Sequence, residues 1–294
     1  MICLKLYRND VEHKTDHDMN EPSQLSLEVM LQAIMNSGYL MECEIANSLS
    51  KDGFFIETNR MLEDPNTGKS REIDLIAEYY DRNDQRVWEK NVCAKIEFIF
   101  EIKNNIYPLV LMNKYDFSPN IEIWESIKEI QTPKDIEWGL DNYYDKISIV
   151  DEPIFTQYCS FDKKKTKDRK IIAKHSEQLH AGFSKIVQYC EEAVESWQER
   201  KEADGYFRKF MFLPALVINE DLYELEIRSG EEPLLHKTEE SKLLFSYHFK
   251  NRPEIATIWI VTKKGFENFI QRLIRLERTM EAEMIQYVRK IDNK

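Results

Sequence analysis

Hydrophobic positions recur along the chain with two different spacings, and together they predict an α/β fold. Alternation with period two, or a short apolar run, predicts strands at residues 54–57, 71–79, 92–103, 209–219, 222–227 and 255–262. Helical spacing predicts helices at residues 27–35, 39–51, 121–130, 171–200 and 266–291. Leaving out residues 106–170 and the hairpin-like piece at 222–227, and taking the interrupted helices at 27–51 together, the order is helix, three strands, helix, two strands and helix. We therefore expect an α/β/α sandwich with a central mixed β-sheet.

The same patterns predict one main domain. Residues 1–22 are polar after a short apolar run and are expected to form an N-terminal arm, whereas residues 23–294 form a single domain. Within it, residues 106–170 contain four prolines and many aromatic side chains between them. A segment this aromatic is expected to pack rather than to stay disordered. We interpret it as an insertion, a subdomain or flap beside the rest of the domain.

Three charged side chains occupy corresponding places on two successive predicted strands. In 71–79, alternation places Ile73, Leu75, Ala77 and Tyr79 on one face and Asp74 on the opposite face. In 92–103, Glu101 and Lys103 share a face, because side chains two apart on a strand point the same way, roughly 6.5–7 Å apart. If the two strands are neighbours, Asp74 meets Glu101 and Lys103.

A fourth acid is expected to reach this place from the helix at residues 39–51. On a helical wheel Glu42 lies inside the arc of Met41, Ile45 and Leu49, whereas Glu44 lies on the polar side. An acid inside an apolar arc is costly unless something pairs with it. We therefore expect Glu42 at the site and Glu44 in solvent.

An acid on one strand followed by Glu-x-Lys at the end of its neighbour resembles the PD-(D/E)XK nuclease superfamily, which has the restriction endonuclease-like fold. The flanking residues 40–42 and 64–74 are also similar to uncharacterised bacterial members. Ile73 stands where the superfamily's name has proline. The resemblance covers roughly the first hundred residues, and beyond them only the order of elements.

The resemblance implies a metal-dependent phosphodiesterase, most of all a DNA endonuclease in restriction, phage defence or repair. Asp74, Glu101, Lys103 and Glu42 would be catalytic. Mg²⁺ or Mn²⁺ would be bound by Asp74, Glu101 and Glu42, whose carboxylates are the hard oxygen ligands that these ions prefer, and by the backbone carbonyl of Ile102. Lys103 would position the attacking water and stabilise the transition state.

Two other functions stay open beside the DNA endonuclease. One is a nuclease fold that binds or scaffolds without cutting, although such a subunit has no physical need for Asp74, Glu101 and Lys103 together. The other is an RNase with the same site. The chain has no G-x-x-x-x-G-K-[ST] loop and no G-x-S-x-G motif, so ATP binding and serine hydrolysis have no support.

Charge complicates nucleic-acid binding. With 41 Lys and Arg against 53 Asp and Glu, the net charge is −12, whereas nucleic-acid-binding domains are usually basic. To bind DNA or RNA, the protein would then need a local basic surface, or affinity supplied by a partner protein or a homodimer.

One basic run stands out, and it is either a solvated face or a contact to the phosphate backbone. It comprises Lys163, Lys164, Lys165, Lys167, Arg169 and Lys170, just before the helix predicted at 171–200.

The remaining composition points to a reducing compartment. Five cysteines are scattered without a C-x-x-C pair, which disfavours zinc and fits reduced thiols in the cytoplasm. No apolar run approaches the ~20 residues of a membrane span, and residues 1–20 lack the apolar core of a signal peptide. We therefore expect a cytoplasmic protein with no membrane contact.

Overall fold

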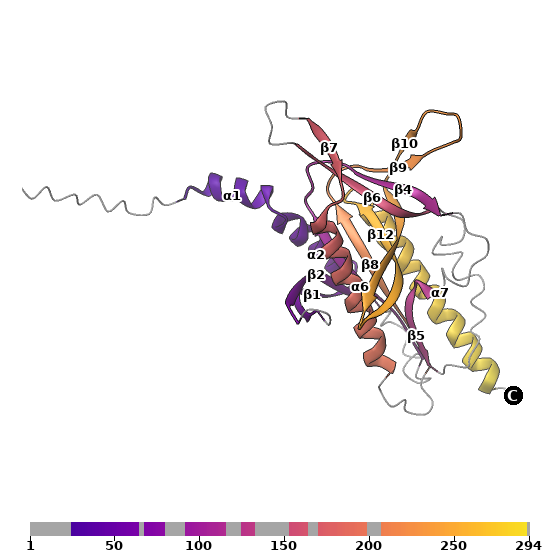
Figure 1. The fold of residues 1–294 in the computed structure, drawn as a ribbon. Coiled ribbons are helices and arrows are strands. Elements are labelled where there is room, and N and C mark those ends of the chain that lie inside the picture. The colour runs from indigo at the N-terminus through magenta and orange to yellow at the C-terminus, as the bar shows by residue number, and fades with distance from the viewer. Residues whose placement is uncertain are drawn as a thin grey trace, which may run out of the picture.

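The computed structural model describes residues 25–64, 68–79, 92–115, 125–132, 153–163, 170–198 and 207–292. Its helices are α1 (Leu27–Asn36), α2 (Tyr39–Lys51), α6 (Glu177–Gln198) and α7 (Phe266–Asp292). Its strands are β1 (Phe55–Glu63), β2 (Ser70–Tyr79), β3 (Val92–Lys103), β4 (Leu109–Tyr115), β5 (Lys128–Thr132), β6 (Ile154–Lys163), β7 (Ile171–Lys174), β8 (Phe207–Ile218), β9 (Leu222–Glu226), β10 (Leu234–Thr238), β11 (Glu240–Phe249) and β12 (Arg252–Thr262). Figure 1 shows α6 in front of the sheet and α7 behind it.

The strands form one large mixed sheet in the order β1-β2-β3-β8-β12-β11-β6-β4-β9-β10. β1, β2 and β3 are successive antiparallel strands, and β8 and β12 continue the sheet parallel to β3. β5 also pairs with β8, and β7 pairs only with β6. A mixed sheet covered by helices on both faces confirms the predicted α/β sandwich architecture.

The segment 106–170 is more integrated than an inserted subdomain or flap. Its described strands β4 and β6 lie within the main sheet, and β5 pairs with residues 208–212 of β8. Residues 128–130 belong to β5, so the helix predicted at 121–130 is wrong there, and residues 121–124 lie outside the described ranges. Residues 171–174 form β7, so the following helix begins at Glu177. The N-terminal arm predicted at 1–22 also lies outside the described residues.

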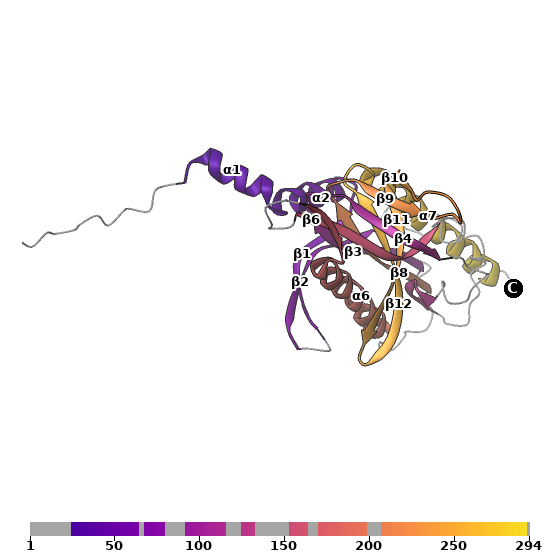
Figure 2. The ribbon, with the colours of Figure 1, turned by 45° about the horizontal axis from the view of Figure 1, so that its top comes forward.

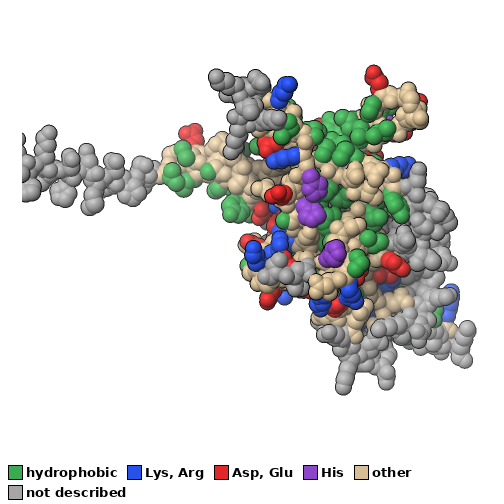
Figure 3. Space-filling view, in the orientation of Figure 1, with side chains coloured by type: hydrophobic (Ala, Val, Ile, Leu, Met, Phe, Trp, Pro, Cys, Tyr) green, Lys and Arg blue, Asp and Glu red, His purple; other side chains and the backbone are tan. Residues whose placement is uncertain are grey.

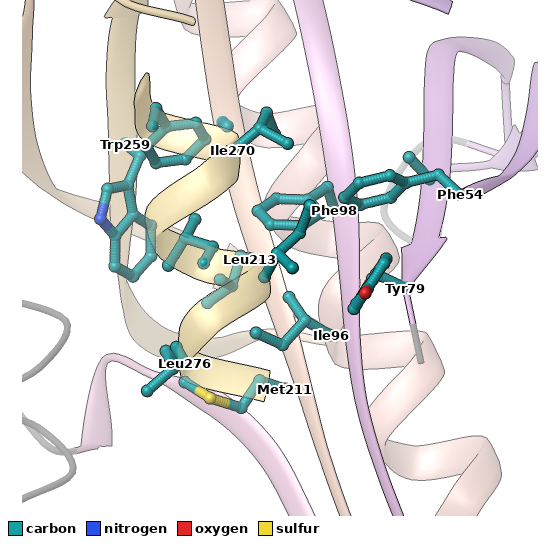
Figure 4. Packing of buried hydrophobic residues seen from close by; sticks show 14 of the residues in the cluster. Phe54, Tyr79, Ile96, Phe98, Met211, Leu213, Trp259, Ile270 and Leu276 are labelled. Carbon is teal, nitrogen blue, oxygen red and sulfur yellow. The ribbon is translucent and has the colours of Figure 1, made fainter. Parts of the chain in front are cut away.

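Alternation along β3 sends apolar side chains to the face that α2 and α7 cover. Phe98 stacks on Phe100 with ring centroids 5.4 Å apart and lies 5.9 Å from Phe54. Figure 4 shows this packing, with Trp259 and Ile270 at one end of the cluster. The apolar periodicity of β3 and α7 therefore fixes which way the intervening residues of β3 must face.

Those intervening residues, Ile99 and Glu101 among them, point to the other face, beneath α6. Ile73 packs in this second cluster too, so its predicted position on the same face as Leu75 is wrong. The reason lies in β1, where Asn59 has φ 57° between the pairs Thr58–Leu75 and Arg60–Ile73. A left-handed residue interrupts the regular pairing there, and simple alternation along β2 fails beside it.

Candidate functional site

The structure brings Asp74, Glu101 and Lys103 together where the C-terminal end of β3 meets the middle of β2. Leu75 pairs with Phe100 in the antiparallel ladder, which places Asp74 opposite Glu101. One oxygen of Asp74, Oδ2, accepts the Ile102 N–H at 2.8 Å. Lys103 Nζ lies 2.5 Å from Glu101 Oε1. The adjacency of the two strands, which the sequence could only assume, therefore holds.

A residue that the sequence analysis missed completes the cluster. Lys185, on α6, places Nζ 3.0 Å from Asp74 Oδ1 and also forms an ion pair with Glu101 Oε2. One ammonium group thus bridges the two carboxylates. The signal in the sequence was a lysine within the apolar stripe of a helix, next to Ile186 and Val187, which are both fully buried.

Gly182 allows α6 to approach this cluster. It lies one turn before Lys185, and a Cβ added there would stand 2.6 Å from Glu101 Oε1. Any side chain would therefore push the Glu101 carboxylate away or lift the helix. The helix passes directly over the acid, and this approach brings the ammonium of Lys185 within reach.

Burial makes the charges of the cluster interdependent. Glu101 is 2% exposed, and Lys185 is almost as deeply buried. Burial by itself would lower the pKa of Lys185, but the negative charges of Glu101 and Asp74, and hydrogen bonds to both, outweigh it and raise that pKa. Lys185 therefore stays protonated and neutralises the acids. The Lys103 side chain is 34% exposed, so the cluster meets solvent there.

Glu42 and Glu44 lie as the helical wheel predicts. Glu42 is half-buried, and its pKa is raised, chiefly by burial and next by the charge of Asp74, while Lys103 acts in the opposite direction. Glu44 is exposed and pairs with Lys263 at 2.5 Å. Glu42 is thus a neighbour of the cluster, whereas Glu44 belongs to the surface.

The cluster of Asp74, Glu101, Lys103 and Lys185 is not by itself a complete metal site. Across the described residues, no three Asp, Glu, His or Cys side chains gather closely enough to hold a metal ion. The expected set of Asp74, Glu101 and Glu42 is therefore not assembled. Asp74 and Glu101 alone converge on a single cation, the ammonium of Lys185.

Buried lysines between acids recur elsewhere under α6. Lys128 contacts Glu191 at 2.5 Å and Glu254 at 3.7 Å, and Lys95 contacts both Glu97 and Glu78. An ammonium bridging two acids is therefore not in itself a catalytic signature in this protein. The cluster at Lys185 differs because a second, solvent-accessible lysine, Lys103, contacts the same acid.

The basic run lies mostly outside the described residues, which include Lys163 and Lys170 but not Lys164, Lys165, Lys167 and Arg169. Lys163 pairs with Ile171 between β6 and β7, and both lysines are exposed. In the sequence, β7 follows the run, so the run does not lead directly into α6. Figure 3 shows the α6 face, where acidic and basic side chains are interspersed.

Other predictions concern the protein as a whole. Cys43, Cys93, Cys159 and Cys190, the cysteines within the described ranges, are free thiols. None of the helices in the described ranges is long and apolar enough to cross a membrane.

No family model, curated protein or solved structure matches the chain. We therefore infer function from the side chains themselves.

Proposed function

We propose that this protein is a metal-dependent phosphodiesterase, most of all a DNA endonuclease. One observation carries the proposal: Asp74 and Glu101, from adjacent strands, converge on one cation, with Lys103 beside them at the solvent boundary. Converging carboxylates supply a place for positive charge, and the accessible lysine supplies a group that can reach a phosphate. The fold proposed with it is the restriction endonuclease-like form of the α/β sandwich.

The donor chemistry fits a hard divalent cation. Carboxylate oxygens of Asp74 and Glu101 are the ligands that Mg²⁺ and Mn²⁺ prefer, and both already point at a positive group. The further ligands that we propose are the carbonyl of Ile102 and Glu42, whose carboxylate is not gathered with the other two in this structure and would have to approach them when an ion binds. Since Lys185 now neutralises the two acids, a bound ion would take over that role. When bound, the ion would supply a more acidic water and neutralise charge on the phosphate.

The chain's own residues have separate roles in this proposal. Lys103 donates hydrogen bonds to the attacking water or to the phosphate oxygens, where negative charge grows in the transition state. Lys185 keeps the carboxylates of Asp74 and Glu101 in place before an ion arrives. Asp74 also fixes the end of β3 through the N–H of Ile102, which keeps the acids in register.

A second function, a nuclease fold that binds or scaffolds without cutting, is favoured by one specific observation. The acids of the cluster are already paired with lysines, as they are around Lys95 and Lys128. A purely structural cluster would look the same. Such a protein would have no use for an accessible lysine on a buried acid, which is why we favour catalysis.

The test is a substrate panel. Purified protein is incubated with supercoiled plasmid, single-stranded DNA and RNA, each with Mg²⁺, Mn²⁺ or EDTA. Nicked or linear plasmid in Mg²⁺ or Mn²⁺, and none in EDTA, is the expected result. Cleavage of RNA alone would assign the RNase alternative, and binding without cleavage of any substrate would assign the scaffold.

A further inference from the structure

The helix α1 exposes large apolar side chains in every turn. Leu27 is 81% and Leu31 is 57% exposed, and no residue of the helix is buried. Figures 1 and 2 both show α1 extending away from the rest of the protein. We call its exposed apolar residues, with those at its two ends, the α1 surface. The α1 surface comprises Leu25, Leu27, Val29, Met30, Leu31, Ile34, Met35 and Tyr39.

The apolar part of α1 is too broad for one supporting surface. At 100° per residue, its only polar side chains, Glu28, Gln32 and Asn36, form a strip one residue wide along the helix. The remaining arc, roughly 240°, is apolar, whereas a helix resting on its own domain needs an arc of about 100°. The sequence of α1 is therefore that of a helix covered from more than one side.

The length of α1 leads to the same conclusion. It has ten residues, and helices shorter than about 12–15 residues are marginal in water without tertiary packing. Ser26 caps its first turn by accepting the Val29 N–H at 3.2 Å. At its other end, Asn104 Nδ2 donates to the carbonyl oxygens of Met35 and Ser37. These contacts fix the ends of the helix and leave its apolar sides available for a partner.

We propose that the α1 surface is the interface between two copies of this chain. Its area matches this role: with roughly 150–200 Å² for each fully exposed large side chain, the eight residues present about 800 Å², which is the contribution of one partner to a standard interface. Two copies carry a net charge of −12 each, and α1 has a single charged residue, Glu28. It is therefore a surface where two acidic chains can meet with little repulsion.

The charge of α1 also argues against other occupants. It contains no lysine or arginine, which contacts to phosphates or to an anionic lipid surface would require. A second copy of the chain carries the same apolar helix face, so a complementary surface is present wherever the protein is. Asn104 follows Lys103 directly, so the proposed interface is anchored one residue from the candidate site.

The test is the mass in solution of the full chain, measured by light scattering from about 1 to about 100 μM. The informative variant combines Leu27→Glu with Leu31→Lys. This i,i+4 pair leaves the net charge unchanged and supports the helix, so only the apolar contact is lost. The matched control combines Ile227→Glu with Leu235→Lys, which are 70% and 55% exposed and lie outside α1.

We expect wild type and control to have twice the mass of one chain, which is 35.2 kDa. The α1 variant should have the mass of a single chain, and at low concentration its unfolding midpoint should equal that of wild type. Wild type that stays a single chain over the whole range would overturn the proposal. So would an α1 variant that remains a dimer. A monomeric wild type that floats with phosphatidylcholine vesicles, when the variant does not, would assign α1 to a lipid surface instead.

Discussion

Replacing Lys185 with methionine is the perturbation that discriminates most sharply between a metal site and a structural ion pair. Methionine keeps the length and apolar stem of the side chain but removes the ammonium between Asp74 and Glu101. Glu101 is then left buried, with Lys103 as its remaining charged partner. Asp74 keeps the Ile102 N–H.

The size of the effect follows from burial. Removing one partner from a buried ion pair costs about 3–5 kcal/mol when the other charge is left uncompensated, and because Glu101 keeps its contact with Lys103 we expect a loss below that range. A divalent ion held by Asp74 and Glu101 would restore that charge, and at a hundred times its Kd a ligand stabilises the folded state by about 2.7 kcal/mol. We therefore expect metal to recover most of the stability that the variant loses. Wild type should gain less, since the ion has to displace Lys185.

The assay is urea unfolding of wild type and of Lys185→Met, each in EDTA and in Mn²⁺. Lys128→Met is the matched control, because Lys128 is an equally buried lysine that contacts two acids, Glu191 and Glu254. The control should lose stability and recover none of it with Mn²⁺. If Lys185→Met is as stable as wild type, or if Mn²⁺ stabilises both variants equally, the assignment of the ion to this cluster is wrong.

Three further predictions concern neighbouring residues. Gly182→Ala should destabilise the protein by about 1–3 kcal/mol and reduce cleavage, because its Cβ would stand 2.6 Å from Glu101 Oε1; Ser184→Ala, next to it on α6, is the control. The raised pKa of Glu42 means that folding disfavours its ionised form, so Glu42→Gln should raise the thermal midpoint of unfolding at pH 7. This gain should disappear as the pH falls below 4.5, where the wild-type carboxyl is protonated in both the folded and the unfolded state. The control, Glu44→Gln, should change the midpoint little at pH 7 or at the lower pH. Lys103→Met should keep its unfolding midpoint but lower the single-turnover cleavage rate about 10²–10³-fold, and a normal rate with weaker binding would show that Lys103 only holds the phosphate.

Much of the fold could be predicted because its strongest elements have one clear periodicity. β3 alternates Phe98, Phe100 and Ile102 with the residues of the site, and α2 was predicted with the bounds that the structure gives. The wheel also separated Glu42 from Glu44, because three apolar residues fixed the buried face of a regular helix. Where local pattern and burial agree, the sequence is sufficient.

The elements that were missed are those whose burial depends on partners distant in sequence. β11 went unpredicted because it contains the fully buried Lys242, which interrupts the apolar pattern, and β7 is a short strand that joins β6. Lys185 was overlooked for the same reason, since a lysine on a helix is ordinarily in solvent. Its burial is explained only by Asp74 and Glu101, which approach from other elements. Ile73 was misplaced because the left-handed Asn59 belongs to the neighbouring strand.

If Asp74 and Glu101 hold the ion that drives phosphodiester hydrolysis, Asp74→Asn should abolish plasmid cleavage in Mn²⁺. Asparagine can still accept the Ile102 N–H, so the strand end is preserved, whereas alanine would leave that group without its partner. Glu44→Gln, which removes a surface carboxylate, is the control. We expect cleavage by wild type and Glu44→Gln, and none by a folded Asp74→Asn protein. Equal cleavage by Asp74→Asn and wild type would contradict this role of Asp74.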